Sequence, residues 1–265
     1  MKNKGLTICV SAAKGGVGKT ITTLNLAGIL EVLNKKVLII DFDLSGGGIS
    51  AALNLVSQKS VYTFVDDYNN NRFEDFKNYV VSYDNFIDVL ASPKDPRQAG
   101  KIDPKYVEII LEKAVFKYDV VLIDTNHNLN DFNILTMDLV DQILFLVTND
   151  PFDLKNMRSL LAVFNDVGYK NYKIMLNESV YPFKKYFSLY DIKNIIGANI
   201  DYVLSASFYI KNIDTFIMNG KIITLEPKAA QVFGKDFTTL MQVITDIYSK
   251  EEEKWHHLEM LLILK

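Results

Sequence analysis

Short runs of apolar residues recur along the chain, and segments with helical spacing separate them. Nearly every position within each run is apolar, which is typical of strands that are covered on both faces, as in a mostly parallel sheet. The runs that predict strands are Leu6–Val10, Val37–Asp41, Phe86–Leu90, Val120–Asp124, Ile143–Val147, Lys173–Asn177 and, more weakly, Ile200–Leu204.

Two of the intervening segments carry apolar residues at intervals of three and four, as an amphipathic helix does. This spacing predicts helices over Lys19–Leu33 and Lys105–Val115. Their apolar stripes consist of Leu26, Ile29, Leu30 and Leu33 in the first and of Val107, Ile110, Leu111 and Val115 in the second. Strands that alternate with helices predict an α/β fold, with a doubly wound, mostly parallel sheet and helices on both faces.

The less regular segments set the expected boundaries. Asp66–Asn71, which ends in three asparagines, predicts a surface loop. We expect residues 1–250 to form a single domain and residues 251–265 to form a tail of different character. The charged run Lys250–Lys254 predicts a solvated helical turn. The apolar segment after it, Trp255–Lys265, is too short to cross a bilayer.

Composition narrows the class of protein. The chain has 265 residues, of which 49% are hydrophobic, so disorder over its whole length is excluded. Its formal net charge of −3 excludes a chain that is basic throughout. Cys9 is the single cysteine, which excludes a disulfide framework, and its place in an apolar run predicts a buried thiol. Without a signal-peptide core or a membrane-spanning run, we expect a cytoplasmic protein.

A glycine-rich segment follows the first predicted strand and leads into a helix. It reads Ser11-Ala12-Ala13-Lys14-Gly15-Gly16-Val17-Gly18-Lys19-Thr20. Such a turn cradles phosphate, because its glycines let backbone N–H groups converge on the anion and the helix dipole adds positive charge. Lys19 would reach the outer phosphates, and the Thr20 hydroxyl would ligate Mg²⁺.

Carboxylates stand at the ends of two predicted strands. Asp41 and Asp43 lie on the same side of an extended segment, and Asp124 ends another strand. Nucleotide sites in such sheets form at the carboxyl ends of the strands. The glycines of the following segment, Leu44–Gly48, supply the flexibility that a mobile switch needs.

The segment Lys14–Thr20 resembles the deviant Walker A motif of the MinD/ParA class of P-loop ATPases, whose signature is the early lysine. The resemblance implies an ATPase that uses ATP and Mg²⁺ and forms an ATP-dependent homodimer. Lys14 of each protomer would reach the phosphates of the other, where a cation stabilises developing charge as an arginine finger does. The nucleotide would contact Gly15, Gly16, Val17, Gly18, Lys19, Thr20 and Ile21.

The same resemblance implies roles for the acids and for one asparagine. Asp41 would hold Mg²⁺ through water, with Thr20 and Asp124 completing the metal site. Asp43 would orient the attacking water, and it would form the catalytic set with Lys14 and Lys19. Asn177 would read the adenine edge with its amide, and an asparagine that merely caps a turn is the alternative.

Two departures from the family pattern bear on the reaction. Ile21 stands where relatives commonly have a second threonine, so one hydroxyl near the α-phosphate is missing. Thr125–Asn130 replaces a proline-containing switch that ends in glycine, and Asn126 or Asn128 could supply the left-handed conformation there. His127 is a weaker candidate for a general base than for a loop or partner contact. The altered switch leaves open a nucleotide-gated scaffold with negligible hydrolysis.

The middle of the chain resembles one branch of the class more closely. The segments Leu90–Pro96, Tyr118–Asp124, Asp138–Val147 and Asp153–Leu161 resemble the CpaE/TadZ branch, whose members localise pilus and secretion machines. This resemblance implies a spatial organiser with an unidentified protein activator or cargo. MinD-like placement of division machinery belongs to the same prediction. A ParA-like partitioning ATPase that binds DNA non-specifically is the alternative, although arginine is scarce in the chain.

Two further segments could contact a partner or a surface. Tyr181–Phe187 is the best cluster of basic and aromatic residues, and we expect a partly buried loop with lysines that extend to solvent. A weak DNA-binding face is its alternative function. In the tail, Trp255, Leu258, Leu261 and Leu262 fall near one side. Its polar residues include Glu251–Glu253 and Glu259 instead of a lysine-rich face, which favours a protein contact or packing onto the domain over peripheral binding at the inner face of the membrane.

Overall fold

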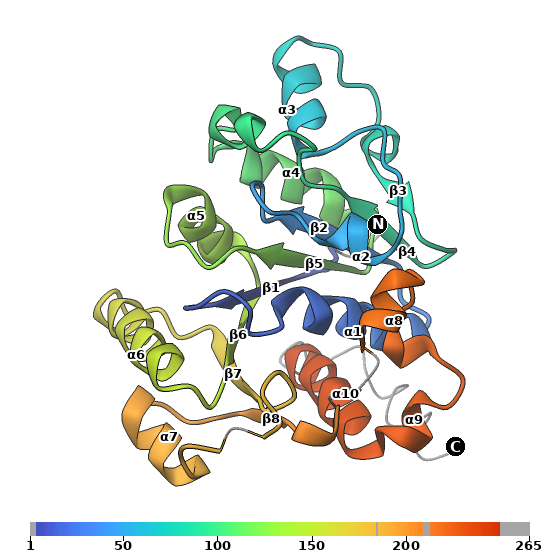
Figure 1. Cartoon of the computed structure of the whole chain (residues 1–265). Coiled ribbons are helices and arrows are strands. Elements are labelled where there is room, and N and C mark those ends of the chain that lie inside the picture. The colour runs from blue at the N-terminus through green and yellow to red at the C-terminus, as the bar shows by residue number, and fades with distance from the viewer. Residues whose placement is uncertain (1–3, 184, 209–212, 250–265) are drawn as a thin grey trace.

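The computed structural model describes residues 4–183, 185–208 and 213–249. An eight-stranded sheet runs through its centre in the order β3-β4-β2-β5-β1-β6-β7-β8 (Figure 1). β3 pairs with β4 in antiparallel fashion, whereas the other neighbouring strands described here are parallel. The strands are β1 (Leu6–Ala12), β2 (Val37–Phe42), β3 (Val81–Ser82), β4 (Ile87–Leu90), β5 (Val120–Thr125), β6 (Gln142–Val147), β7 (Tyr172–Asn177) and β8 (Tyr202–Leu204).

Helices cover both faces of the sheet, as predicted for a doubly wound fold (Figure 1). The α-helices are α1 (Lys19–Val32), α2 (Ile49–Ala52), α3 (Val61–Asn69), α4 (Tyr106–Val115), α5 (Asp131–Leu139), α6 (Pro151–Asp166), α7 (Leu189–Ile196), α8 (Ile213–Met218), α9 (Ala229–Val232) and α10 (Gly234–Ser249). The 3-10 helices are η1 (Phe76–Tyr79), η2 (Pro96–Lys101), η3 (Ala206–Phe208) and η4 (Ile223–Leu225).

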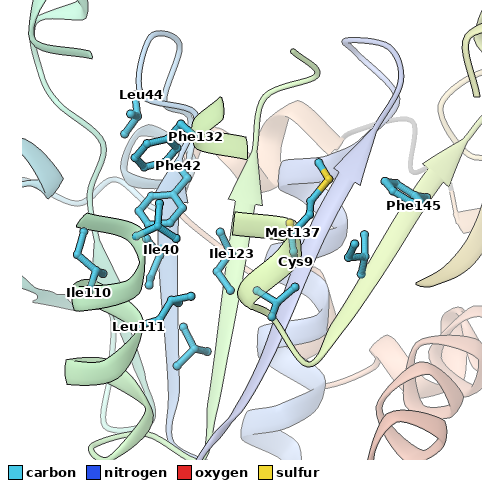
Figure 2. Close-up of a cluster of buried hydrophobic side chains, with 14 of the residues drawn as sticks. Cys9, Ile40, Phe42, Leu44, Ile110, Leu111, Ile123, Phe132, Met137 and Phe145 are labelled. Atoms are coloured by element: carbon cyan, nitrogen blue, oxygen red, sulfur yellow. The ribbon is translucent and has the colours of Figure 1, made fainter. Parts of the chain in front are cut away.

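Each face of the sheet has its own hydrophobic cluster. The cluster that α1 and α10 cover includes Leu26 and Ile244, both fully buried. On the other face, the side chains of α4 and α5 pack against strand residues such as Ile40 and Phe42 (Figure 2). Because strand side chains alternate between the faces, runs that are apolar at every position feed both clusters.

The predicted strands and helices correspond closely to the observed ones. The largest shift at a strand start is at β8, which begins at Tyr202 instead of Ile200, whereas β4, β6 and β7 each begin one residue from the predicted start. α1 ends at Val32, one residue before the predicted end, and α4 begins at Tyr106. The short strand β3 was not predicted, because two residues at a sheet edge carry too little pattern to be recognised.

The prediction of a loop over Asp66–Asn71 is wrong for most of that segment. α3 continues through Asn69, and the chain turns only afterwards, where Asn71 adopts a left-handed φ of 55°. A capping box formed by Ser60 and Thr63 starts this helix. The buried Phe64 then anchors it in a cluster of aromatic rings, so tertiary packing outweighs the low helix propensity of the polar residues.

Three further predictions concern the cysteine, membrane-spanning helices and the C-terminal segment. Cys9 is fully buried in β1, as expected, and burial raises the pKa of its thiol to about 12. None of the described helices combines the length and apolar character needed to span a membrane. The turn predicted for Lys250–Lys254 and the tail Trp255–Lys265 lie outside the described residues.

Candidate nucleotide-binding site

The glycine-rich loop joins the end of β1 to the start of α1, as the sequence predicts. Gly16 has a φ of +74° and Gly18 a φ of +94°, in the left-handed region that favours glycine. A Cβ at Gly18 would also lie 2.6 Å from the Asn177 side-chain nitrogen. The loop therefore needs glycine both for its conformation and for its close approach to β7.

The metal-binding candidates meet beneath this loop. Asp41 on β2 and Asp124 on β5 are register partners on adjacent strands, and both are buried. The Thr20 hydroxyl donates to Asp124 Oδ2 at 2.7 Å. Asp41 accepts backbone N–H bonds from Asp43 at 3.2 Å and from Ile49 at 3.1 Å. The parallel register thus brings together the residues that the motif comparison placed at Mg²⁺.

Burial shapes the charge of this group. It raises the pKa of Asp41 to about 8, and repulsion from Asp124 and Asp43 adds to the shift. It also raises the pKa of Asp124 to about 6, while the Thr20 hydrogen bond and the Lys19 charge oppose that shift. Burial lowers the pKa of Lys19, against the attraction of Asp124 and Asp43. Carboxylates that are difficult to ionise in isolation are stabilised as anions by a nearby cation.

These donors fit Mg²⁺ as a metal bound mainly through water and phosphate. The described residues include no group of three or more His, Cys, Asp or Glu side chains that could hold a metal. Mg²⁺ typically takes one or two protein oxygens and fills its other positions with water and substrate phosphate. The Thr20 hydroxyl and the Asp124 carboxylate supply such oxygens, with Asp41 beside them.

A cavity of about 410 Å³ opens above this group. Its size is within the range of small-molecule sites. Its lining includes the predicted residues Gly15, Gly16, Gly18, Lys19, Thr20, Ile21, Asp43 and Asn177. Val17 does not line the cavity, because its side chain is buried below the loop. Phe208, which the sequence did not single out, closes part of the cavity wall.

Lys14 pairs within its own chain. Its ammonium lies 2.9 Å from Asp150 Oδ1, and the side chains are 32% and 17% exposed. Asp150 also caps α6 by accepting the backbone N–H groups of Phe152 and Asp153. Asp150 is not among the predicted site residues, although an aspartate directly before Pro151 is a typical start of a helix.

Asn177 is engaged with the protein through both ends of its amide. Its Nδ2 donates to the Val17 carbonyl at 3.0 Å. Its Oδ1 accepts from the Ser179 backbone at 3.1 Å and from the Ser179 hydroxyl at 2.6 Å. Asn177 therefore braces the phosphate loop and a turn after β7, which resembles the alternative of a capping asparagine. Recognition of adenine by its second N–H stays a prediction.

The segment Thr125–Asn130 closes on itself in a way that the sequence did not predict. The expectation of a left-handed Asn126 or Asn128 is wrong, since neither has a positive φ. The Asn126 side chain instead accepts from the Asn128 backbone at 2.9 Å and from Asn133 Nδ2 at 2.7 Å. These side-chain bonds form the turn without left-handed backbone.

His127 is exposed, and it lies against the phosphate loop. A Cβ at Gly15 would be 3.4 Å from its Nδ1 atom. His127 also lines the cavity. Its position fits a contact with the loop, and its role in proton transfer stays a prediction.

The expectation of a partly buried loop over Tyr181–Phe187 is wrong for its aromatic tips. Phe183 is 96% exposed and Tyr186 is 57% exposed. Asn149 holds the end of this segment, donating to the Phe187 carbonyl and accepting from the Phe187 N–H. Tyr181 and Phe187, at the two ends of the segment, are partly buried as predicted.

Comparison with known proteins identifies the family. A family model described as an AAA domain, AAA_31, matches residues 5–177. The chain belongs to this family. The relatives and the fold place it in the MinD/ParA class of P-loop ATPases.

Two curated relatives illustrate the range of this class. The chromosome-partitioning ATPase Soj of Thermus thermophilus is 25% identical over 210 residues, which cover 78% of this chain and 79% of Soj. The septum site-determining protein MinD of Synechocystis is 34% identical over 129 residues, which cover 44% of this chain and 43% of MinD.

Solved structures share the fold. A ParA family ATPase from Chlorobium tepidum has a TM-score of 0.77 at 17% identity, over 90% of this chain and 98% of that one. MinD from Pyrococcus horikoshii in complex with Mg-ADP has a TM-score of 0.73 at 20% identity, over 90% of this chain and 96% of that one. This AAA_31 chain therefore has the MinD/ParA fold.

Proposed function

We propose that this protein binds Mg²⁺·ATP in the 410 Å³ cavity, dimerises around it and hydrolyses it slowly until a partner stimulates it. The observation that carries the proposal is the position of Thr20, Asp124 and Asp41 directly beneath the phosphate loop. Bound Mg²⁺·ATP supplies the phosphoryl group and a cation that neutralises its charge. Lys19, which also lines the cavity, would hold the outer phosphates.

Asp43 and Lys14 have separate roles in this scheme. Asp43 lines the cavity and accepts the Gly46 N–H at 3.0 Å, so its second oxygen is available to orient water. Lys14 would leave Asp150 and reach the phosphates of the second protomer. A partly exposed ion pair contributes about 1 kcal/mol or less, whereas a cation supplied in trans accelerates phosphoryl transfer by ~10³–10⁵. The pair with Asp150 is therefore weak enough for Lys14 to leave it, and the lysine would have its large effect on turnover only in the dimer.

The biological role follows from the class and from the resemblance of the middle segments. Residues 1–250 would act as one ATPase domain that positions a pilus, secretion or division machine, as the CpaE/TadZ and MinD comparison implies. The protein would work in the cytoplasm and contact its cargo, or the inner face of the membrane, peripherally. The similarity to Soj supports ParA-like partitioning with weak DNA binding as the alternative.

A nucleotide-gated scaffold is the second candidate. The observation that favours it is the closed turn at Thr125–Asn130, where Asn126 is already bonded to Asn128 and Asn133. A switch held in this way would respond to nucleotide without supporting rapid turnover.

Phosphate release from purified protein separates these functions. We expect slow Mg²⁺-dependent release by the wild-type protein and none by Lys19→Ala. Stimulation by DNA would indicate the ParA-like role, and stimulation by vesicles of anionic lipid would indicate a MinD-like role. No response to either would indicate a protein activator. ATP binding without release, with every addition, would support the scaffold and contradict the ATPase.

A further inference from the structure

An apolar groove of about 460 Å³ lies in the C-terminal third of the chain. Phe216 of α8, Ile223 of η4 and Phe233 form its walls. Val232 of α9 lies at its rim with 64% of its surface exposed. Apolar side chains thus dominate a recess that is open to solvent, which is typical of a binding surface.

A larger cavity elsewhere has a different character. It encloses about 700 Å³ beside the start of β1 and α4. Charged side chains contribute much of its lining, namely Lys4, Glu108, Glu112, Lys113 and Lys117. An apolar chain segment would desolvate these charges, so the groove near α9 is the better site for such a segment.

The groove shares structural elements with the nucleotide cavity. The Phe233 ring, in the groove wall, packs edge-to-face on Phe208 with 5.5 Å between centroids, and Phe208 lines the nucleotide cavity. On the η4 side, Thr224 is bonded to Asn25 of α1 through its backbone N–H and its hydroxyl. Two contacts therefore connect the groove to the nucleotide site: the Phe233–Phe208 ring pair and the hydrogen bonds between η4 and α1.

We infer that this groove binds the chain's own C-terminal segment, with Trp255, Leu258, Leu261 and Leu262 as the inserted residues. These residues recur at helical spacing on one side of a segment whose other positions include acids such as Glu259. The groove lining supplies a cation, Lys228, for such acids, and the one acid in the lining, Glu226, is paired with Lys221 at 3.1 Å. Both the apolar face and its charged border are therefore complementary to the groove.

The C-terminal segment is long enough to reach the groove from the end of α10. α10 begins at Gly234, directly after Phe233 in the groove wall, and its 16 residues extend for about 24 Å. Residues 250–254 would span up to ~17 Å if they extend instead of forming the predicted helical turn, and a helix from Trp255 to Leu261 would add ~10 Å. The segment can thus fold back along α10 and place Leu261 at the groove within the same molecule.

Trp255 allows a direct test, because it is the single tryptophan of the chain. Acrylamide quenching of its fluorescence is measured in the full-length protein without nucleotide and in a synthetic peptide of residues 250–265. We expect severalfold weaker quenching in the protein and a blue-shifted emission. Val232→Asp should raise quenching to the level of the peptide. The matched control Val167→Asp, at a valine that is 74% exposed at the end of α6, should leave it unchanged.

Further measurements distinguish docking within one molecule from binding of a second copy of the chain and from binding of the C-terminal segment to lipid. Leu261→Asp should release Trp255 as Val232→Asp does, whereas protection that persists in both variants would overturn the inference. Protection that disappears on dilution would assign the groove to a second copy, and a blue shift only with phosphatidylglycerol vesicles would assign the segment to lipid. Either result overturns docking within one molecule. The measurement needs no ATP, so it is independent of the proposed ATPase function.

Discussion

The two halves of the candidate site are built in different ways. In the buried half, Asp41 and Asp124 are held side by side by the register of β2 and β5. In the exposed half, Lys14 and Asp150 meet through a single ion pair between a loop and a helix start. Moving the buried acids would require a slip of the sheet, whereas Lys14 is released by breaking one partly solvated contact. The buried half is therefore the fixed half, where we propose that Mg²⁺ binds, and the exposed half is the adjustable half, from which Lys14 would reach a second protomer.

The largest expected effect tests the adjustable half. Lys14→Ala should keep nucleotide binding but lose dimerisation and reduce ATP turnover by ~10³ or more, because the cation supplied in trans is absent. Asp43→Ala is the companion variant, which should keep ATP-bound dimers and lose turnover. Sedimentation with ATP and phosphate release measure the two properties. Turnover of Lys14→Ala at the wild-type rate would show that Lys14 does not act across a dimer.

A second prediction tests the fixed half. Lys19→Ala should weaken Mg²⁺·ATP binding by on the order of 100-fold, since hydrogen bonds to a charged group contribute about 1.5–3 kcal/mol each. Isothermal titration calorimetry measures the affinity, and thermal unfolding checks that the variant is folded. Unchanged affinity would place the nucleotide outside this cavity.

A third prediction uses the pKa of Asp124, which burial raises from 3.8 to about 6. An acid whose pKa is raised by folding stabilises the fold most below its unfolded pKa, and this contribution is lost as the pH rises through about 6. Asp124→Asn replaces this carboxyl with a neutral amide, so the variant buries no charge at this position at any pH. The free energy of unfolding of the variant relative to wild type should therefore increase from pH 4 to pH 8, by up to about 3 kcal/mol.

Urea unfolding without nucleotide, at both pH values, measures this difference. The exposed Glu112→Gln is the control, for which we expect no such trend. If the stability of Asp124→Asn relative to wild type stays flat or falls with pH, the raised pKa of this buried carboxylate is contradicted.

The smallest expected effect concerns Asp150. Asp150→Asn keeps a side-chain oxygen for the start of α6 but removes the charge that holds Lys14. Because a partly exposed ion pair contributes at most about 1 kcal/mol, turnover should rise by about fivefold or less. Steady-state phosphate release measures the rate. A loss of turnover as large as that of Lys14→Ala would give Asp150 a direct role in the reaction.

The difference between the halves also explains which features the sequence could predict. The phosphate loop and the strand-end acids have short motifs whose chemistry depends on neighbours in the chain, so Lys19, Thr20 and Asp124 could be placed in advance. The partner of Lys14 is 136 residues away. Its identity depends on the fact that β1 and β6 are adjacent, and that adjacency is a property of the assembled sheet.

Side-chain hydrogen bonds explain why the conformation at Asn126 and the partners of Asn177 were not predicted from the sequence. Asparagine tolerates left-handed backbone, and this preference suggested such a turn at Asn126. In the folded chain, the Asn126 carboxamide instead bonds Asn133 of α5. Likewise, the amide of Asn177 fits an adenine edge in isolation, but in the fold the carbonyl of Val17 already accepts one of its N–H groups. Local preference alone could not decide between these competing partners.

Gly28 gives the P-loop helix its contact with the C-terminal third. A Cβ at this position would lie 2.2 Å from the Thr224 hydroxyl oxygen, and that hydroxyl donates to the Asn25 carbonyl. With no space between the two segments, α1 cannot slide along its axis unless η4 travels with it or these bonds break. Gly28 thus couples the position of α1 to that of η4, and even a methyl group added there would push the two segments apart.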